Sequence, residues 1–563
     1  MNVSNEAPRK RPRKHDKLDY VQCRVGRFTF WVSSLTNAPA LPIMGIPAVF
    51  KSDKDIRRVG NYTFEWTEDH IPRETTDPLR YTYDKLGAAA VDRIQEIHRR
   101  SAAAADGDAQ HISRLDLLAV LEANHGTDAV LGQLWDEVHS VPGWVDWAQL
   151  ERGQRFLYRY ALANLMGFAL QGFVGENSAS QGVVEVLVRT GGFSTRVLLR
   201  RLLETFQLLL QVTHSPGFLE PGGEGHRSAV RVRLLHSMVR QRILKIVEAR
   251  GAEYFDVATL GVPLNTLDSL HALTTFGCNH AFIQLPLMGI TARPAEVEDY
   301  VALWRYVGYL LGTPTEHFAS AARAKVLMDS LSYHERGLTD SSLVCGHNFV
   351  ETVRDLEPIN LSAGFIEAGS RVLNGDALCD DLGMRRPGLY HYACFRGYCW
   401  FVKTLAAAQQ WFPRLDAKII DFNRDMLHSA IIHSKAGLAG GSKLKFKHVP
   451  DGTLTGKESS AVKRVVLWKR PKVAPQTAPA QIHSLLLAPL SRRLIPPLIA
   501  IVPRDGCDVG SDVALALPEV KGNSLHPTSR SSYPHLNWEE EPSKELYLIE
   551  IKTGPGSKSA RLG

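Results

Sequence analysis

The stretch RVRLLHSMVRQRI, residues 231–243, places a histidine among apolar residues. His236 lies beside Leu235 on one face of a helix, because apolar residues recur there at spacings of three and four: Val232, Leu235, Val239 and Ile243. The arginines of the stretch occupy the other faces and the borders. An unpaired buried polar group costs roughly 1–3 kcal/mol, so this imidazole needs a partner. The partner could be a side chain, a backbone carbonyl or a metal.

The same helical periodicity continues in both directions from this stretch. Helical patterns follow one another from Tyr83 to about residue 448, and QRFLYRYALANLMGFALQGFVG (154–175) is apolar enough to be a central core helix. No alternation of strands and helices and no internal repeat occurs. The sequence therefore predicts a mostly α protein, with a single large all-helical domain over residues 61–450.

The two ends of the chain differ from this domain. Residues 1–60 form a basic extension with a candidate strand pair around CRVGRFTFWVSS (23–34). Residues 451–563 are rich in proline, serine and charge, so we expect both extensions to be poorly ordered.

Composition bounds the functional classes. The net charge of +7 is modest for 563 residues, so no nucleic-acid partner is expected. No apolar segment follows the basic N-terminus and no run of eighteen apolar residues occurs, so neither a secretory signal nor a transmembrane span is expected. HSLLLAPLSRRLIPPLIAIVP (483–503) is a candidate for peripheral contact with an endomembrane. Seven scattered cysteines are typical of reduced thiols, which indicates a cytoplasmic protein.

A second polar group lies on an otherwise apolar helix. In RRLLET (200–205), Arg201, Glu204 and Thr205 stand three and four residues apart and so project from one helix surface. Glu204 and Arg201 are either an intrahelical ion pair at the border of the helix or members of a buried site. The residues alone leave both interpretations open.

Several segments in a fixed order resemble a known family. They are ETFQLLL (204–210), VRLLH (232–236), GVPLNTLDSLHALTTF (261–276), EDYVALWRYVGYLLG (298–312) and HSKAGLAGGSKLKF (433–446). Over residues 130 to 440 the chain is similar to the family of rubber oxygenases (latex clearing proteins) and ER-bound mycophenolic-acid side-chain oxygenases, and the last segment resembles its fungal branch.

The resemblance implies an all-α fold around haem b. It implies His236 as the iron ligand, and Arg201 and Thr205 as the distal pair of an R-x-x-x-T pattern. Glu204 stands where latex clearing proteins can carry a lysine, and by resemblance it could act as a base toward the substrate. Arg233 and Arg305 are candidate partners of the haem propionates.

The implied activity is that of a dioxygen-using haem oxygenase. Its substrate would be a hydrophobic small molecule or a polyprenyl chain, cleaved oxidatively at a carbon–carbon double bond. Two alternatives stay open: a haem-free helical interaction protein that kept the fold, and a haem peroxidase or hydroxylase. Haem itself tests the first alternative, and carbonyl products test the second.

Other polar residues have more ordinary interpretations. Asn265 and Asp268 are expected to form an N-cap pair ahead of a helix. The remaining histidines near these segments are expected at the surface or in loops: His214, His226, His271, His280 and His317.

Overall fold

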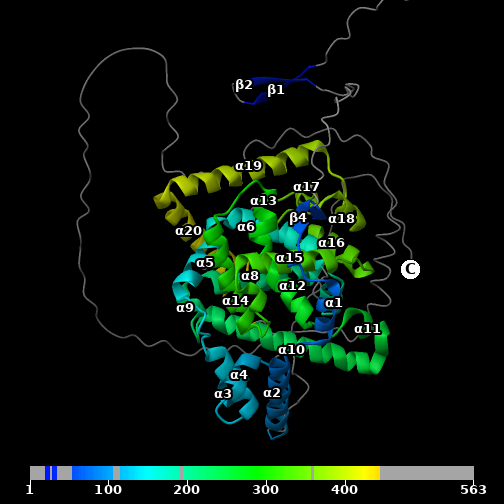
Figure 1. Cartoon of the computed structure of the whole chain (residues 1–563), viewed down its shortest axis with the longest axis vertical. Coiled ribbons are helices and arrows are strands. Elements are labelled where there is room, and N and C mark those ends of the chain that lie inside the picture. The colour runs from blue at the N-terminus through cyan, green and yellow to red at the C-terminus, as the bar shows by residue number, and fades with distance from the viewer. Residues whose placement is uncertain are drawn as a thin grey trace, which may run out of the picture. The chain divides into compact units, whose positions relative to one another are not determined.

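The structure is a computed structural model that describes residues 20–25, 28–33, 54–104, 115–190, 195–356 and 360–443. Within these residues nearly all regular structure is helical, so the predicted fold class is confirmed (Figure 1). The expected C-terminal extension, 451–563, lies outside them. None of the helices in these ranges combines the length and apolarity that a bilayer span requires.

Two antiparallel hairpins precede the helices. β1 (Tyr20–Val25) pairs with β2 (Phe28–Ser33), which confirms a strand pair in the first sixty residues. β3 (Asp55–Val59) pairs with β4 (Tyr62–Trp66) through a turn that holds Gly60 at a φ of +63°. The domain boundary expected at residue 60 falls inside this second hairpin.

The helices then follow in sequence. They are α1 Arg73–Thr76, α2 Lys85–Ala104, α3 Leu117–Asn124, α4 Ala129–His139, α5 Trp147–Arg159, α6 Ala161–Gly167, α7 Gln181–Arg189, α8 Thr195–Thr213, α9 Pro216–Leu219, α10 Glu224–Arg250, α11 Val257–Leu260, α12 Thr266–Gly277, α13 Leu285–Leu287, α14 Pro294–Leu310, α15 Ala321–His334, α16 Asp340–Val353, α17 Ala363–Asn374, α18 Asp376–Asp381, α19 Leu389–Trp411 and α20 Pro413–His428. Three π-helical segments interrupt them: η3 Phe168–Asn177, η5 His280–Gln284 and η7 Ser429–His433.

Side-chain caps explain several of the helix starts. The carboxylates of Asp116, Asp128 and Asp146 accept hydrogen bonds from backbone N–H groups in the first turns of α3, α4 and α5. The Asn265 side chain accepts a hydrogen bond from the Asp268 N–H at 2.8 Å, so the cap predicted for α12 is confirmed.

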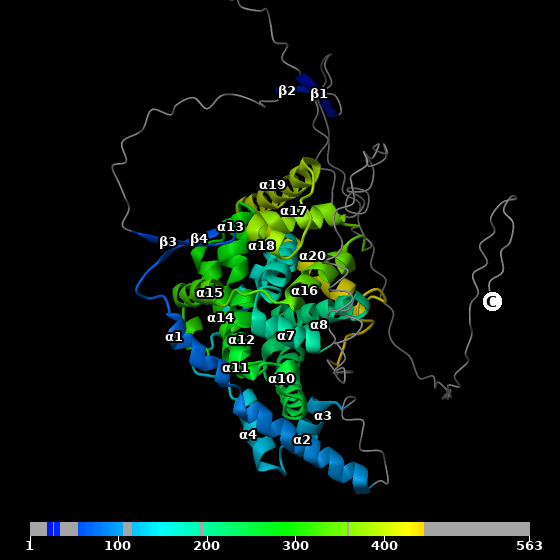
Figure 2. The ribbon, with the colours of Figure 1, turned by 90° about the vertical axis from the view of Figure 1, so that its right-hand side faces the viewer.

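The apolar segments predicted for the core do form it. α6 and η3 contain the centre of the apolar segment 154–175, and most of their side chains are buried. α5 packs against α14, where Tyr300 and Trp304 are fully buried. α10 packs against α8, α2 and α3, and Figure 2 shows it passing between α8 and the α2–α4 end of the domain.

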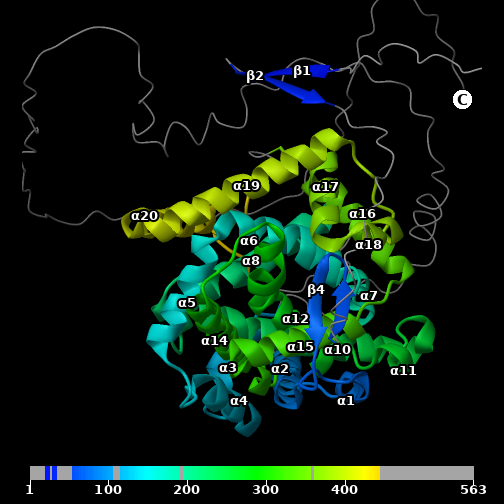
Figure 3. The same ribbon diagram turned by 45° about the horizontal axis from the view of Figure 1, so that its top comes forward.

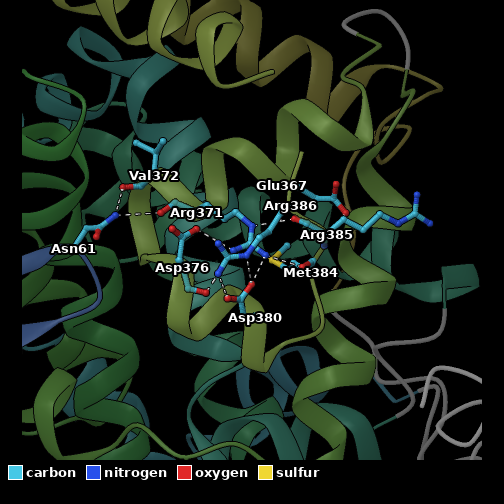
Figure 4. Close-up of polar contacts among 9 residues, drawn as sticks. All are labelled: Asn61, Glu367, Arg371, Val372, Asp376, Asp380, Met384, Arg385 and Arg386. Atoms are coloured by element: carbon cyan, nitrogen blue, oxygen red, sulfur yellow. Dashed lines mark hydrogen bonds and ion pairs between the residues drawn. The ribbon is translucent and has the colours of Figure 1, made fainter. Parts of the chain in front are cut away.

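A buried arginine ties α17 to the segment that follows it (Figure 4). The Arg371 guanidinium donates to the Asp376 carboxylate at 2.9 Å, to that of Asp380 at 2.7 Å, and to the carbonyl oxygens of Met384 at 2.7 Å and Arg385 at 2.9 Å. Its side chain is 1% exposed.

The C-terminal end of α17 also holds the β3–β4 hairpin. The Asn61 amide donates to the carbonyl oxygens of Arg371 and Val372 (Figure 4). A Cβ on Gly60 would lie 2.1 Å from the Asn374 carbonyl oxygen, so only glycine allows the turn to come this close. Two parts of the chain more than 300 residues apart are thereby joined.

Replacing Arg371 with leucine should lower the free energy of unfolding by about 3 kcal/mol, because two buried carbonyls and two carboxylates lose their donor. Arg386→Leu is the matched control. Arg386 also pairs with Asp380 but is 65% exposed, so its loss should cost less than about 1 kcal/mol. Urea titrations of the two variants measure the difference, and equal losses would contradict the assigned role of Arg371.

Candidate functional site

The candidate site lies where α8 and α10 pack together. Both helices present an apolar face to the core, with Leu198, Leu202 and Leu209 buried on α8 and Val232, Val239 and Ile243 buried on α10. Polar side chains within or beside these faces are therefore held in surroundings that exclude most water.

His236 is half-buried beside these faces and has no hydrogen-bond partner among the residues that the structure describes. Burial, reinforced by the positive charges of Arg240 and Arg201, lowers the pKa of His236 to about 4. The ring is therefore neutral at pH 7. Part of it borders a cavity of about 10 Å³, which has room for one water molecule and is also lined by Ser237 and Thr266.

A neutral imidazole with an unpartnered nitrogen is the form that ligates haem iron. The donor at His236 therefore fits this group. The small cavity is the size of a water molecule and is not a porphyrin pocket, so the fit rests on the donor. No cluster of three or more His, Cys, Asp and Glu side chains that could hold a metal ion occurs in the described ranges. Haem iron, in contrast, is coordinated by only one or two protein side chains.

Arg233 lies on α10 one turn before His236. Its guanidinium donates to both carboxylate oxygens of Asp84, at 2.7 and 2.9 Å, and to the Glu137 carboxylate at 2.7 Å. Burial opposes the charge, but these carboxylates raise the pKa of Arg233 above its usual value. Arg233 thus joins α10 to α4 and to the residue just before α2.

Arg240 lies one turn after His236 and fixes the other side of this segment. It donates to the carbonyl oxygens of Pro263 at 3.1 Å and Leu264 at 2.7 Å, and it stacks over the Tyr83 ring at 4.8 Å. Burial lowers the pKa of Arg240. Its cationic group is what depresses the pKa of His236 most after burial itself.

Of the residues predicted on α8, Arg201 lies near His236. Burial lowers the pKa of Arg201, partly opposed by the charge of Glu204, and its guanidinium donates to the Thr190 hydroxyl at 2.7 Å. The Thr205 hydroxyl donates to the Arg201 carbonyl oxygen at 3.0 Å. This bond fixes the rotamer of Thr205 and keeps its hydroxyl on the helix.

Glu204 lies at the border of the helix. Its carboxylate pairs with Arg200 at 3.1 Å and accepts a hydrogen bond from the Ser442 hydroxyl at 2.8 Å. The intrahelical ion pair therefore exists, but its cation is Arg200, which is 57% exposed, and not the buried Arg201. The pair lies four residues apart, one turn of the helix.

Arg305 lies on α14, away from the contacts just described. Its guanidinium stacks over the Trp144 ring at 4.0 Å, and its Nε is buried without a hydrogen-bond partner within the described ranges. Within the described part of the chain, no hydrogen bond, ion pair or ring contact connects it with His236. The structure thus brings Arg201, Arg233 and His236 together around α10 and leaves Arg305 apart.

The sequence pattern did not indicate a buried polar cluster around Glu176. The Glu176 carboxylate on η3 accepts hydrogen bonds from Gln171 at 2.7 Å and pairs with His271 of α12 at 3.0 Å. Despite burial, the hydrogen bond to His271 and the charge of Arg336 lower the pKa of Glu176, and Glu176 raises the pKa of His271; both shifts favour the charged forms.

The expectation that the other histidines lie at the surface is wrong for three of them. His226, His271 and His280 are buried, each with a hydrogen-bond partner: the carbonyl oxygen of Val138, the Glu176 carboxylate and the Gln284 side chain. The partners of His226 and His271 lie on other elements and leave no mark on the local sequence pattern, whereas Gln284 lies four residues after His280 in η5. The sequence signal that could have identified them is a histidine on an apolar helix face, the signal that was used for His236.

Replacing Arg233 with methionine should lower the free energy of unfolding by about 3 kcal/mol, because Asp84 is left buried without its cation. The matched control is Arg227→Met on the same helix. Arg227 is 41% exposed and pairs with Glu122 at 2.6 Å, so its loss should cost less than about 1 kcal/mol. Chemical denaturation of the two variants distinguishes them.

Asp268 makes stability depend on pH. Burial and the charge of Glu335 raise the pKa of its carboxyl to about 7, above the value of an unfolded chain. The folded state therefore binds more protons than the unfolded state between about pH 4 and 7, and stability falls as pH rises through this window, by on the order of 4 kcal/mol.

The Asp268→Asn variant should lose this dependence and gain stability relative to the wild type at pH 8. Thermal unfolding at pH 5 and pH 8 measures the change. Asp355→Asn, at a carboxyl that is 70% exposed, should leave the wild-type pH profile intact. An unchanged profile in the Asp268 variant would contradict the raised pKa.

Comparisons with known proteins find similarity over the region that contains the candidate site. Residues 152–404 match the family model described as ER-bound oxygenase mpaB/B'/Rubber oxygenase, catalytic domain, and all six predicted site residues lie within this range. Among solved structures the chain is similar to that of latex clearing protein LCP in the closed state, with 16% identity and a TM-score of 0.48, over 62% of this chain and 91% of that chain. No curated protein sequence matches it.

Proposed function

We propose that this chain, whose residues 152–404 match the mpaB/rubber oxygenase family model, is a member of that family and a haem b-dependent oxygenase. This match supports the class of oxygenase. The proposal adds the cofactor, dioxygen as the oxidant, and oxidative cleavage of a carbon–carbon double bond in a hydrophobic, polyprenyl-type substrate.

One observation carries the proposal: the neutral, unpartnered imidazole of His236, half-buried where α8 and α10 pack together. A buried histidine that serves packing alone usually finds a hydrogen-bond partner, as His226 and His271 do here. His236 would hold the iron through one ring nitrogen. When bound, haem supplies the activation of dioxygen, which no side chain of the protein can perform.

The chain's own groups would orient the reactants. The Arg201 guanidinium, whose charge reaches His236, is a donor and cation for oxygen atoms that gain negative charge. Its hydrogen bond to Thr190 fixes its direction. Thr205 donates to the Arg201 carbonyl and so would reach a substrate only after turning about its own χ1.

Glu204 is the proposed base. To accept a proton from the substrate its carboxylate would have to exchange Arg200 or Ser442 for the substrate. Arg200 is 57% exposed, and such a pair contributes little to stability, so the exchange is cheap. Of the present partners of the Glu204 carboxylate, Arg200 is exposed and Ser442 is half-buried.

The two proposed propionate partners differ in how many hydrogen-bond partners their guanidinium groups already have. Arg305 has a buried Nε without a partner, which an added carboxylate would satisfy. Arg233 already holds Asp84 and Glu137, so a propionate there would compete with two carboxylates. Arg305 therefore has the spare hydrogen-bonding capacity, whereas Arg233 is the one that lies beside His236.

The surroundings suit an apolar substrate in a reducing compartment. Phe206 and Leu235 beside the polar groups are partly buried and pack against the apolar core of the domain. Among the described residues, Cys278, Cys345 and Cys379 are buried free thiols, which supports the proposed intracellular location. Peripheral contact with an endomembrane is part of the proposal.

Supplying haem to the purified full-length protein should produce a Soret band that is lost or shifted in His236→Gly. Free imidazole should restore the band in this variant, because it replaces the missing ligand in the space left by the side chain. His347→Gly, at an exposed histidine of α16, is the control and should bind haem as the wild type does. Absorption spectra of the three proteins, with and without imidazole, make the test.

A folded wild-type protein with no Soret band would contradict the proposal and favour the haem-free interaction protein. A band without carbonyl products from a polyprenyl substrate under air would favour a peroxidase or hydroxylase. Circular dichroism of each variant establishes that it is folded before its spectrum is interpreted.

A further inference from the structure

α19 and its junction with α20 expose a run of large apolar side chains. Leu389 is 87% exposed, Trp400 69% and Trp411 80%. Each is followed by a second exposed large side chain, so that three pairs occur: Leu389/Tyr390, Trp400/Phe401 and Trp411/Phe412. We call these six residues the aromatic ridge.

The spacing places the three pairs on one side of the helix. Each pair follows the previous one by eleven residues, which is close to three turns of an α-helix. Leu389 and Trp411 are twenty-two residues apart, so the ridge is about 33 Å long. A straight line of this kind suits contact with an extended, flat surface.

The opposite face of α19 is fixed in the folded domain. Phe395, Cys399 and Val402 are buried, and the Tyr398 hydroxyl donates to the Leu162 carbonyl oxygen at 2.7 Å. α19 packs against α17, α20 and α6, and Figures 1 and 3 show it along the outer edge of these helices. The ridge is therefore part of a firmly held surface.

The charged residues of the segment that carries the ridge have one sign. From Asp381 to Asp416 no acidic residue intervenes, and five basic residues occur: Arg385, Arg386, Arg396, Lys403 and Arg414. All five are exposed, and Arg386 among them is paired with Asp380. Contiguous exposed apolar surface of this extent marks an interaction site, and the cations indicate an anionic partner.

We propose that the aromatic ridge docks this domain onto an anionic lipid surface. Tryptophan and tyrosine favour the interface between acyl chains and headgroups, and lysine and arginine beside them are attracted to anionic headgroups. The proposal is independent of haem and of the proposed reaction. No helix in the described part of the domain could span a membrane. The proposal identifies the ridge as the surface through which the domain contacts one.

Two other occupants fit the charges less well. Residues 444–504, which follow the described part of the domain, contain eleven basic and two acidic residues, so they have the same sign as the ridge. A second copy of the chain would likewise oppose one set of five cations to another. An anionic membrane attracts the ridge and the following segment alike.

The test is flotation of the full-length protein with vesicles of phosphatidylcholine alone or with about one third phosphatidylserine. The wild type should bind the anionic vesicles. Trp400→Ser/Trp411→Ser should lower the partition coefficient about tenfold or more, because the two largest exposed side chains no longer enter the interface. Arg396→Glu/Lys403→Glu should lower binding to the anionic vesicles only.

Ile56→Ser/Tyr333→Ser is the matched control, at residues of β3 and α15 that are 59% and 43% exposed; it should bind as the wild type does. Melting temperatures of all variants verify folding. The proposal is overturned if the wild type binds neither vesicle, if it binds both equally, or if the tryptophan variant still binds, which would assign binding to another basic segment. A lipid-free dimer that the tryptophan substitutions dissociate would instead assign the ridge to self-association.

Discussion

The arrangement around α10 depends on a buried guanidinium that cannot be left without anions. Arg233 meets this need with Asp84 and Glu137, which lie 149 and 96 residues earlier in the chain. Its Nε also lies where Gly312, at a φ of +71°, turns after α14; a Cβ there would come within 2.6 Å. One cation thus determines where four parts of the chain meet, and His236 lies one turn along the same helix.

Regular periodicity accounts for what could be predicted. The all-helical class, the apolar segment 154–175 and the Asn265 cap each follow from residues a few positions apart, which is the range over which helical patterns act. The intrahelical pairing of Glu204 was foreseen in kind, but the choice between Arg200 and Arg201 depends on which side of α8 faces the core. That is decided by the packing of α8 against α10.

Buried polar groups were the part that local sequence could not predict. Glu176 and His271 lie 95 residues apart, and neither carries a neighbouring residue that indicates a partner. The composition of α19 indicates a buried helix, because a helix with apolar residues on most faces usually lies inside a protein. One face of α19 is nevertheless exposed. Only the packing of Phe395 and Val402 inward shows which face of α19 remains outside.

The π-helical turn of η3 sets the direction of two of these polar side chains. Gln171 and Glu176 are five residues apart and hydrogen-bond each other, although residues five apart on an α-helix point about 140° away from one another. The wider turn brings Glu176 to His271 of α12 and Gln171 to Asn279 and Gln284, which follow α12. A deletion of one residue in this segment would restore an ordinary helix and rotate the Glu176 carboxylate away from His271. The length of this segment is therefore as strongly constrained as its polar residues, and relatives of different length there would have to place their interior carboxylate on another element.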